Sequence, residues 1–169
     1  STVFFSAADA TNGTELWKSD GTTAGTVLVS NIFAGSTSSS PTVLRNVAGT
    51  LFFAATDTTA NGQELWKSDG TAGGTVMVKN INPTANASSS ISSPVAVGSL
   101  LYFSANDGVS GQELWRYDPT TNTTSLVADV WNGGGSAPAS LTVLDSRIYF
   151  SANGGATGPE PWVVDPAVP

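Results

Sequence analysis

The sequence predicts an all-β fold made of repeated four-stranded antiparallel sheets of the β-propeller type. Tryptophan recurs at an almost constant spacing, which is the mark of a repeat architecture. Each period contains four short apolar runs separated by turn residues, and no segment shows a 3.6-residue apolar period with helix caps. Repeating four-stranded units of this length are typical of propeller blades. The positions that set the period are Trp17, Trp66, Trp115 and Trp162.

The first run of each period is expected to form a hairpin with the second. It covers residues 41–47, 94–97 and 140–144. A link of only two residues follows each copy, and such links join adjacent antiparallel strands. The links are Ala48-Gly49, Gly98-Ser99 and Asp145-Ser146.

The second and third runs differ in their expected burial. The second run is aromatic, β-branched and apolar at consecutive positions, which indicates a strand covered on both faces. The third run alternates more clearly, as a strand nearer solvent does. The second run covers residues 3–7, 51–55, 101–105 and 148–152, and the third covers 15–20, 64–69, 113–118 and 160–165.

The fourth run, at residues 26–32, 75–81 and 124–130, is reached through an Asp-Gly or Asp-Pro turn. A long return rich in Ser and Gly then leads to the next period. These boundaries predict a single repeat domain over residues 1–169, with about three and a half blades. The blade units cover residues 1–40, 41–90, 91–137 and 138–169. A β-sandwich and a β-solenoid remain as alternative folds.

The third run carries a distinctive motif. Glu-Leu-Trp-Lys-Ser-Asp-Gly-Thr stands at residues 15–22 and again, unchanged, at 64–71. The third copy departs from it after Trp115 and resembles a kelch blade, and the fourth has Pro161 and no Gly-Thr. The units resemble bacterial ELWxxDGT repeats, which are kelch-like propeller blades in secreted and surface proteins. This resemblance implies a propeller fold in an extracellular setting, and it brings no catalytic residues with it.

Composition narrows the range of functions. The chain has a net charge of −7, which argues against nucleic-acid binding, and it lacks His and Cys, the residues of imidazole and thiol chemistry. No apolar run is long enough for a membrane helix. We therefore expect no enzymatic activity, no membrane insertion and no cofactor other than calcium.

The four repeated tryptophans are expected to pack within the blades, with sugar stacking as the alternative. Trp131 differs, because it lies in a return loop beside three glycines. With Asn132 and its counterpart Phe33, it is a candidate contact for a glycan or a neighbouring subunit, and an anchor of the loop is the alternative.

Two sets of carboxylates recur. Glutamates two residues before each Trp are expected to accept hydrogen bonds from backbone N–H groups in their own turn, with glycoside cleavage as the alternative. Aspartates that open the loops between the second and third runs are expected to form Asx turns, with a calcium site as the alternative. The first set is Glu15, Glu64, Glu113 and Glu160, and the second is Asp9, Asp57 and Asp107.

These observations favour a structural or adhesive repeat module in an extracellular or cell-surface protein. An incomplete set of blades exposes apolar sheet faces. We expect self-association, either of two chains into a closed ring or head to tail into a filament or matrix. The alternative to self-association is that this sequence is a fragment of a longer chain that supplies the missing blades. The alternative is a lectin-like propeller that binds glycans.

Overall fold

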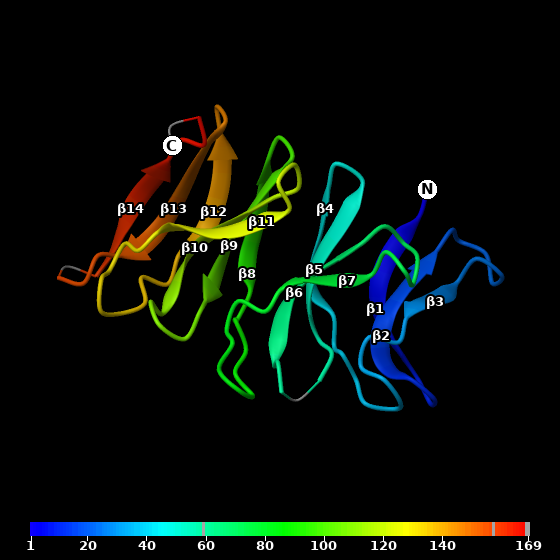
Figure 1. The fold of residues 1–169 in the computed structure, drawn as a ribbon. Coiled ribbons are helices and arrows are strands. Elements are labelled where there is room, and N and C mark those ends of the chain that lie inside the picture. Colours follow the sequence, from blue (N-terminus) through cyan, green and yellow to red (C-terminus); the bar gives the residue numbers. More distant parts are fainter. Residues whose placement is uncertain (59, 157, 168–169) are drawn as a thin grey trace. The chain divides into compact units, whose positions relative to one another are not determined.

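The computed structural model describes residues 1–58, 60–156 and 158–167, and it confirms the all-β prediction (Figure 1). No helix in these ranges is long and apolar enough to cross a membrane. The strands are β1 (Val3–Asp9), β2 (Gly13–Ser19), β3 (Val27–Ser30), β4 (Thr42–Val47), β5 (Thr50–Thr56), β6 (Gln63–Ser68), β7 (Val76–Lys79), β8 (Ser92–Val97), β9 (Leu100–Asn106), β10 (Gln112–Asp118), β11 (Thr123–Ala128), β12 (Ala139–Leu144), β13 (Arg147–Asn153) and β14 (Pro159–Val164).

The strands form four antiparallel sheets of the propeller-blade type. Sheet A has the order β1-β2-β3, sheet B β4-β5-β6-β7, sheet C β8-β9-β10-β11 and sheet D β12-β13-β14. Strands that are adjacent within a sheet are therefore also consecutive in the sequence, as the short predicted links require. Contacts divide the chain into two compact units, Ser1–Ser88 with sheets A and B and Ser89–Pro169 with sheets C and D.

The two-residue links form the predicted hairpins. Val47 pairs with Thr50 across the first link, in which Ala48 and Gly49 have φ angles of 50° and 88°. Asp145 and Ser146 have φ angles of 49° and 62° in the last link. Two successive positive φ angles characterise the type I′ turn, whose twist matches that of the flanking strands.

The first strand of sheets B, C and D contains a bulge that the sequence did not predict. The register shifts between Thr42 and Arg45 in β4, and comparable shifts occur in β8 and β12. A residue with positive φ lies at the shift in each case, and a bulge of this kind bends the strand. These residues are Val43, Ser93 and Ser140.

The Asp-Gly-Thr turn is held by its own side chains. Asp69 accepts hydrogen bonds from the Thr71 backbone N–H at 2.8 Å and from the Thr71 hydroxyl at 2.7 Å. The Gly74 N–H donates to the Thr71 hydroxyl at 3.0 Å. A Cβ atom at Gly74 would lie 2.1 Å from the Asp69 carboxylate, so this position requires glycine. The same bonds recur at Asp20, Thr22 and Gly25.

Each unit has an apolar core between its two sheets. In the first unit, Leu16 and Val29 of sheet A pack against sheet B, and Phe4 of β1 lies against the same cluster. In the second unit, Tyr102 and Leu114 of sheet C pack against sheet D. The residues contributed by the second sheet are Leu51, Phe53, Ala55 and Trp66 in the first core, and Leu141, Ile148, Phe150 and Ala152 in the second.

Candidate functional site

The repeated glutamates Glu15 and Glu113 are fully buried and hold the return loops. Glu15 accepts hydrogen bonds from the backbone N–H of Ile32 at 2.9 Å and of Ser39 at 3.0 Å, and from the Ser39 hydroxyl. Glu113 accepts from the backbone N–H of Ser136 at 2.7 Å and from the Ser136 hydroxyl. Each carboxylate therefore ties its own strand, β2 or β10, to the loop that follows the next strand, β3 or β11.

This arrangement corrects the expectation that the glutamates bond within their own turn. Their partners lie 17 to 24 residues further along the chain. Glu64 is also fully buried and accepts from the Ile81 N–H at 2.8 Å. Sequence spacing alone could not reveal these partners, because the intervening loop differs in length and composition between repeats. A Ser residue recurs near the end of each return loop, and this recurrence is the feature of the sequence that could have indicated the partner of each glutamate.

Glu160 is the exception among the four. It lies on the exposed edge strand β14, and its carboxylate makes no hydrogen bond to any residue that the structure describes. The contrast with Glu113 has a simple cause, since the loop that bonds Glu113 follows β11, and no equivalent loop follows β14 in the described part of the chain. The four glutamates lie on four different sheets, on strands β2, β6, β10 and β14.

The aspartates at the loops between second and third strands make local hydrogen bonds. Asp9 accepts from the backbone N–H of Thr11 and Asn12, and Asp107 from those of Val109 and Ser110, as in an Asx turn. Asp57 accepts from the side-chain amide of Asn61. No group of three or more carboxylate, His or Cys ligands occurs among the described residues. Calcium binding stays a prediction, which a titration would test.

Trp131 packs on glycines of two loops in the second unit. A Cβ atom added at Gly134 would lie 3.0 Å from the Trp131 ring, and one at Gly155 would lie 2.7 Å from Nε1. The ring is half-buried in this position, while Asn132 is exposed. Phe33, the counterpart in the first unit, is also half-buried. A role for these residues in glycan or partner contact stays a prediction.

The repeated tryptophans differ in exposure. Trp66 and Trp115 are buried and Trp17 is half-buried. Trp162 in β14 is exposed, and its Nε1 donates to the Ala152 carbonyl oxygen at 3.1 Å. The position in the repeat is the same, so the surroundings of β14 must account for the difference.

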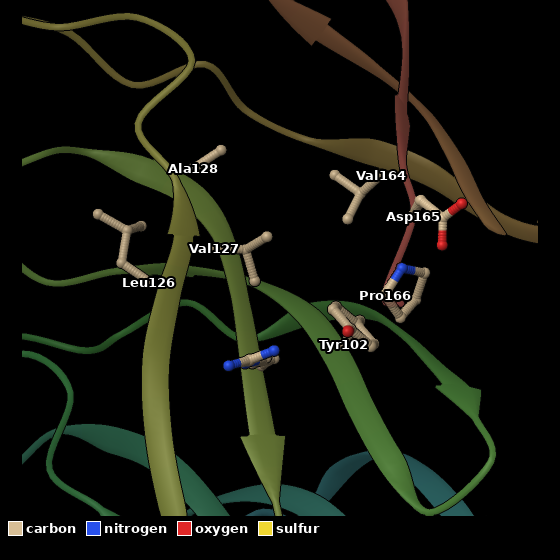
Figure 2. A pocket seen from close by; sticks show the side chains of 8 residues that line it. Tyr102, Leu126, Val127, Ala128, Val164, Asp165 and Pro166 are labelled. Atoms are coloured by element: carbon tan, nitrogen blue, oxygen red, sulfur yellow. The ribbon is translucent and has the colours of Figure 1, made fainter. Parts of the chain in front are cut away.

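A groove of about 500 Å³ opens beside β14 in the second unit. Figure 2 shows side chains of β11 on one side of it and the end of β14 on the other. Its walls are mainly apolar, and its polar side chains are Tyr102, Arg116 and Asp165. A groove with apolar walls and few charged groups suits an apolar or peptide ligand.

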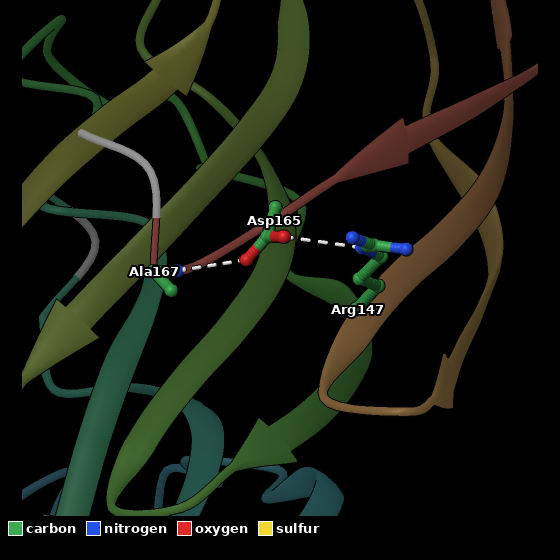
Figure 3. Close-up of polar contacts among 3 residues, drawn as sticks. All are labelled: Arg147, Asp165 and Ala167. Atoms are coloured by element: carbon green, nitrogen blue, oxygen red, sulfur yellow. Dashed lines mark hydrogen bonds and ion pairs between the residues drawn. The ribbon is translucent and has the colours of Figure 1, made fainter.

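Asp165 at the rim of the groove is fixed by two partners (Figure 3). Its carboxylate accepts from the Ala167 N–H at 3.0 Å and from Nε of Arg147 at 3.1 Å. These two hydrogen bonds, the Ala167 one first, hold the pKa of Asp165 below its usual value. Asp165 therefore stays ionised at neutral pH and orders the turn that follows β14.

No family model matches the chain, and no curated protein matches it. The fold is similar to the crystal structure of puromycin hydrolase, with a TM-score of 0.66 and 19% sequence identity. The likeness covers 98% of this chain and 25% of that chain, so the present chain spans about a quarter of the length of that protein. It supports the propeller-like repeat fold. The resemblance to ELWxxDGT repeats stays a prediction from the motifs.

This likeness corrects one expectation. The absence of His and Cys led us to expect a chain without enzymatic activity, whereas the matched structure is that of a hydrolase. Blades of this type therefore occur in an enzyme. The lack of His and Cys alone does not exclude that a chain with this fold is part of an enzyme. At 19% identity the likeness establishes the fold, and the hydrolysis of puromycin is a property of the matched protein.

Proposed function

We propose that this chain is a blade-repeat module that associates head to tail with further copies through its terminal sheets. The observation that carries the proposal is the exposure of Tyr149 on β13. Tyr102 holds the same position in sheet C, where it is 1% exposed and packs against sheet D. Tyr149 is 41% exposed.

Tyr149 belongs to an apolar face of sheet D. Val163 is its cross-strand partner, and Leu144 pairs with Arg147, two residues before Tyr149 on the same strand. Side chains of paired residues and of alternate residues share a face of a sheet. Tyr149, Val163 and Leu144 are all exposed. An exposed apolar group of this kind is typical of an interaction surface.

Sheet A offers a complementary face. In the first unit, Phe4 packs against a surface that contains Leu51 and Phe53 of β5. Val3 and Phe5 hold the positions of Leu51 and Phe53 in β1, because Phe5 pairs with Trp17 as Phe53 pairs with Trp66. Val3 is 62% exposed. The Tyr149 face of one copy can therefore pack on the Val3 face of a second as Phe4 packs on sheet B.

Contacts of this type join two different faces, so they propagate from copy to copy. A ring, a filament or a matrix can result, depending on the rotation between copies. An adhesive role in an extracellular or cell-surface setting belongs to the same proposal and is supported by the Ser-, Thr-, Gly- and Asn-rich composition.

Sedimentation velocity over a range of protein concentrations tests the proposal. The wild-type mass is expected to rise with concentration, and Tyr149→Lys or Val3→Asp to abolish the rise. The two variants mixed together are expected to form a dimer and nothing larger, because each retains one intact face. Val109→Lys is the matched control, since Val109 is a highly exposed residue in a loop. A wild-type protein that stays monomeric at every concentration would refute the proposal.

A further inference from the structure

Four asparagines of this chain are each followed directly by glycine. Such a pair is chemically labile, because the glycine backbone nitrogen can attack the asparagine side-chain carbon and glycine has no Cβ atom to obstruct the approach. The attack requires a carboxamide that is free to turn onto the backbone and a glycine nitrogen that donates no hydrogen bond. The four pairs are Asn12-Gly13, Asn61-Gly62, Asn132-Gly133 and Asn153-Gly154.

The carboxamide of Asn12 is held at both of its polar atoms. Its Nδ2 donates to Oδ2 of Asp9 at 2.8 Å, and its Oδ1 accepts from Nδ2 of Asn31 at 2.9 Å. The next residue lies against the return loop, since a Cβ atom at Gly13 would lie 2.8 Å from the Ser36 carbonyl oxygen. Rotation of the Asn12 side chain onto the Gly13 nitrogen would therefore break two hydrogen bonds within a crowded turn.

Asn61 is held in the same way in sheet B. Its Nδ2 donates to Oδ1 of Asp57 at 3.1 Å, and its Oδ1 accepts from Nδ2 of Asn80 at 3.2 Å. A Cβ atom at Gly62 would lie 2.1 Å from the Ala87 carbonyl oxygen. The repeat thus places an aspartate from before the turn and an asparagine from after the next strand around each of these two side chains.

Asn153 has one side-chain hydrogen bond. Its Oδ1 accepts from the backbone N–H of Gly155 at 2.8 Å, and its own N–H donates to the Ser136 carbonyl oxygen at 2.7 Å. The residue is half-buried at the end of β13. Its carboxamide must leave the Gly155 N–H before it can turn onto the Gly154 nitrogen.

Asn132 is bound by none of these restraints. It is exposed, and its side chain makes no hydrogen bond to any residue in the described part of the chain. It lies in a turn closed by a hydrogen bond of 3.0 Å from the Gly134 N–H to the Trp131 carbonyl oxygen, in which Gly133 has a φ angle of 96°. Such a turn uses the N–H of its fourth residue, so the Gly133 nitrogen stays available. A Cβ atom at Gly133 would meet no atom within 4 Å.

We infer that Asn132 is a site of spontaneous modification, at which the neutral carboxamide is converted to a carboxylate. The Gly133 nitrogen attacks Cγ of Asn132 and loses its proton, and the side-chain nitrogen takes up a proton and leaves as ammonia. The product is a five-membered imide ring. Water then adds to one of the two ring carbonyl carbons, its C–N bond breaks and the nitrogen regains a proton. The ring opens to aspartate or to isoaspartate, in which the main chain runs through the former side chain.

The surrounding loop can accommodate this change. On one side of the turn the Trp131 ring packs on glycines of two loops, and on the other Ser136 bonds the buried Glu113 through both its N–H and its hydroxyl. Asn132 bonds neither anchor, so the new charge stays in solvent. The Tm of the converted protein is therefore expected to lie within about 2 °C of that of the unmodified protein.

Incubation of the folded protein in a mildly alkaline buffer, followed by proteolysis and mass spectrometry, tests the inference. The exchange of NH2 for OH changes the mass of each converted peptide, and an isoaspartyl methyltransferase labels the isoaspartate product. Conversion is expected to be at least about tenfold faster at Asn132 than at Asn12 or Asn61, because those side chains must first break two hydrogen bonds. Asn153 should also convert more slowly than Asn132. In guanidinium chloride the four rates should become similar, since the chain is then unfolded.

The variant Asn31→Ala tests whether hydrogen bonds provide the protection. It removes the donor to Oδ1 of Asn12 and should accelerate conversion there, while Asn61 in the same unit and Asn132 keep their rates. An unchanged rate at Asn12 would count against the inference. Conversion at any of the other three asparagines as fast as at Asn132 in the folded wild-type protein overturns it. Absence of conversion at Asn132 in the folded protein, when the unfolded protein reacts there, overturns it as well.

Discussion

Glu15 on β2 and Ser39 in the following return loop are joined by two hydrogen bonds across 24 residues of sequence. The carboxylate accepts from both the backbone N–H and the hydroxyl of Ser39, and both residues are fully buried. A carboxylate that accepts several N–H and O–H groups can be buried without a cationic partner, because each donor stabilises its charge. This pair fixes where the chain leaves one sheet for the next.

Loss of such a pair should destabilise the fold. Glu113→Ala is expected to lower the free energy of unfolding by about 3 kcal/mol, since it leaves buried N–H and O–H donors at Ser136 without an acceptor. Chemical denaturation followed by fluorescence measures the change. Glu160→Ala is the matched control at the same repeat position, and its effect should stay within about 0.5 kcal/mol. Equal effects of the two substitutions would contradict the structural role of Glu113.

Gly74, three residues after the Asp-Gly-Thr turn, should tolerate no side chain. Gly74→Ala would place a Cβ atom 2.1 Å from the Asp69 carboxylate, so the hydrogen bonds from Thr71 would have to break. We expect a loss of about 2 kcal/mol in the free energy of unfolding. The neighbouring Gly73→Ala meets no atom within 4 Å and should leave the melting temperature almost unchanged or slightly higher.

The repeated tryptophans should differ in their contribution to stability. Trp66→Ala is expected to cost about 3–5 kcal/mol, the usual range for a large side chain removed from a core. Trp162→Ala should cost clearly less, because much of that ring is already in contact with solvent. Urea denaturation of the two variants provides the comparison. A larger loss for Trp162→Ala would show that β14 is covered in solution.

Acid should weaken the Asp-Gly-Thr turns. The Thr22 hydroxyl and then its N–H lower the pKa of Asp20 below 3.8, and those of Thr71 do the same for Asp69. A lowered pKa in the folded state adds stability that is fully present above pH 3.8 and is lost as the pH falls through the folded value.

The double variant Thr22→Val, Thr71→Val tests this linkage. It should have a lower Tm than the wild type at pH 6, and the difference should shrink as the pH falls below 3.8. Thermal melts at several pH values measure it. A difference in Tm that does not change with pH would contradict the proposed role of the two aspartates.

Much of the local structure followed from sequence. The aromatic second runs became the central strands β5, β9 and β13, and the two-residue links became the turns between adjacent strands. These features depend on a few consecutive residues, whose side-chain alternation and backbone preferences act locally. The repeat period of the sequence then indicated which strands belong to the same sheet.

The contacts of the glutamates and the bulges at Val43, Ser93 and Ser140 did not follow from sequence. Glu15 bonds residues that are distant along the chain, and no spacing rule connects a strand to a loop of variable length. A bulge is an extra residue in one of two paired strands, so it can be recognised only when the register between the two strands is known.

The sequence by itself determined that this chain repeats a four-stranded unit and where its strands and turns lie, because those properties are local and periodic. Only the tertiary structure decided that Trp66 and Trp162, or Tyr102 and Tyr149, have different surroundings at equivalent positions. Burial depends on which neighbour covers a residue. Identical motifs therefore become core residues in one sheet and solvent-exposed residues in another.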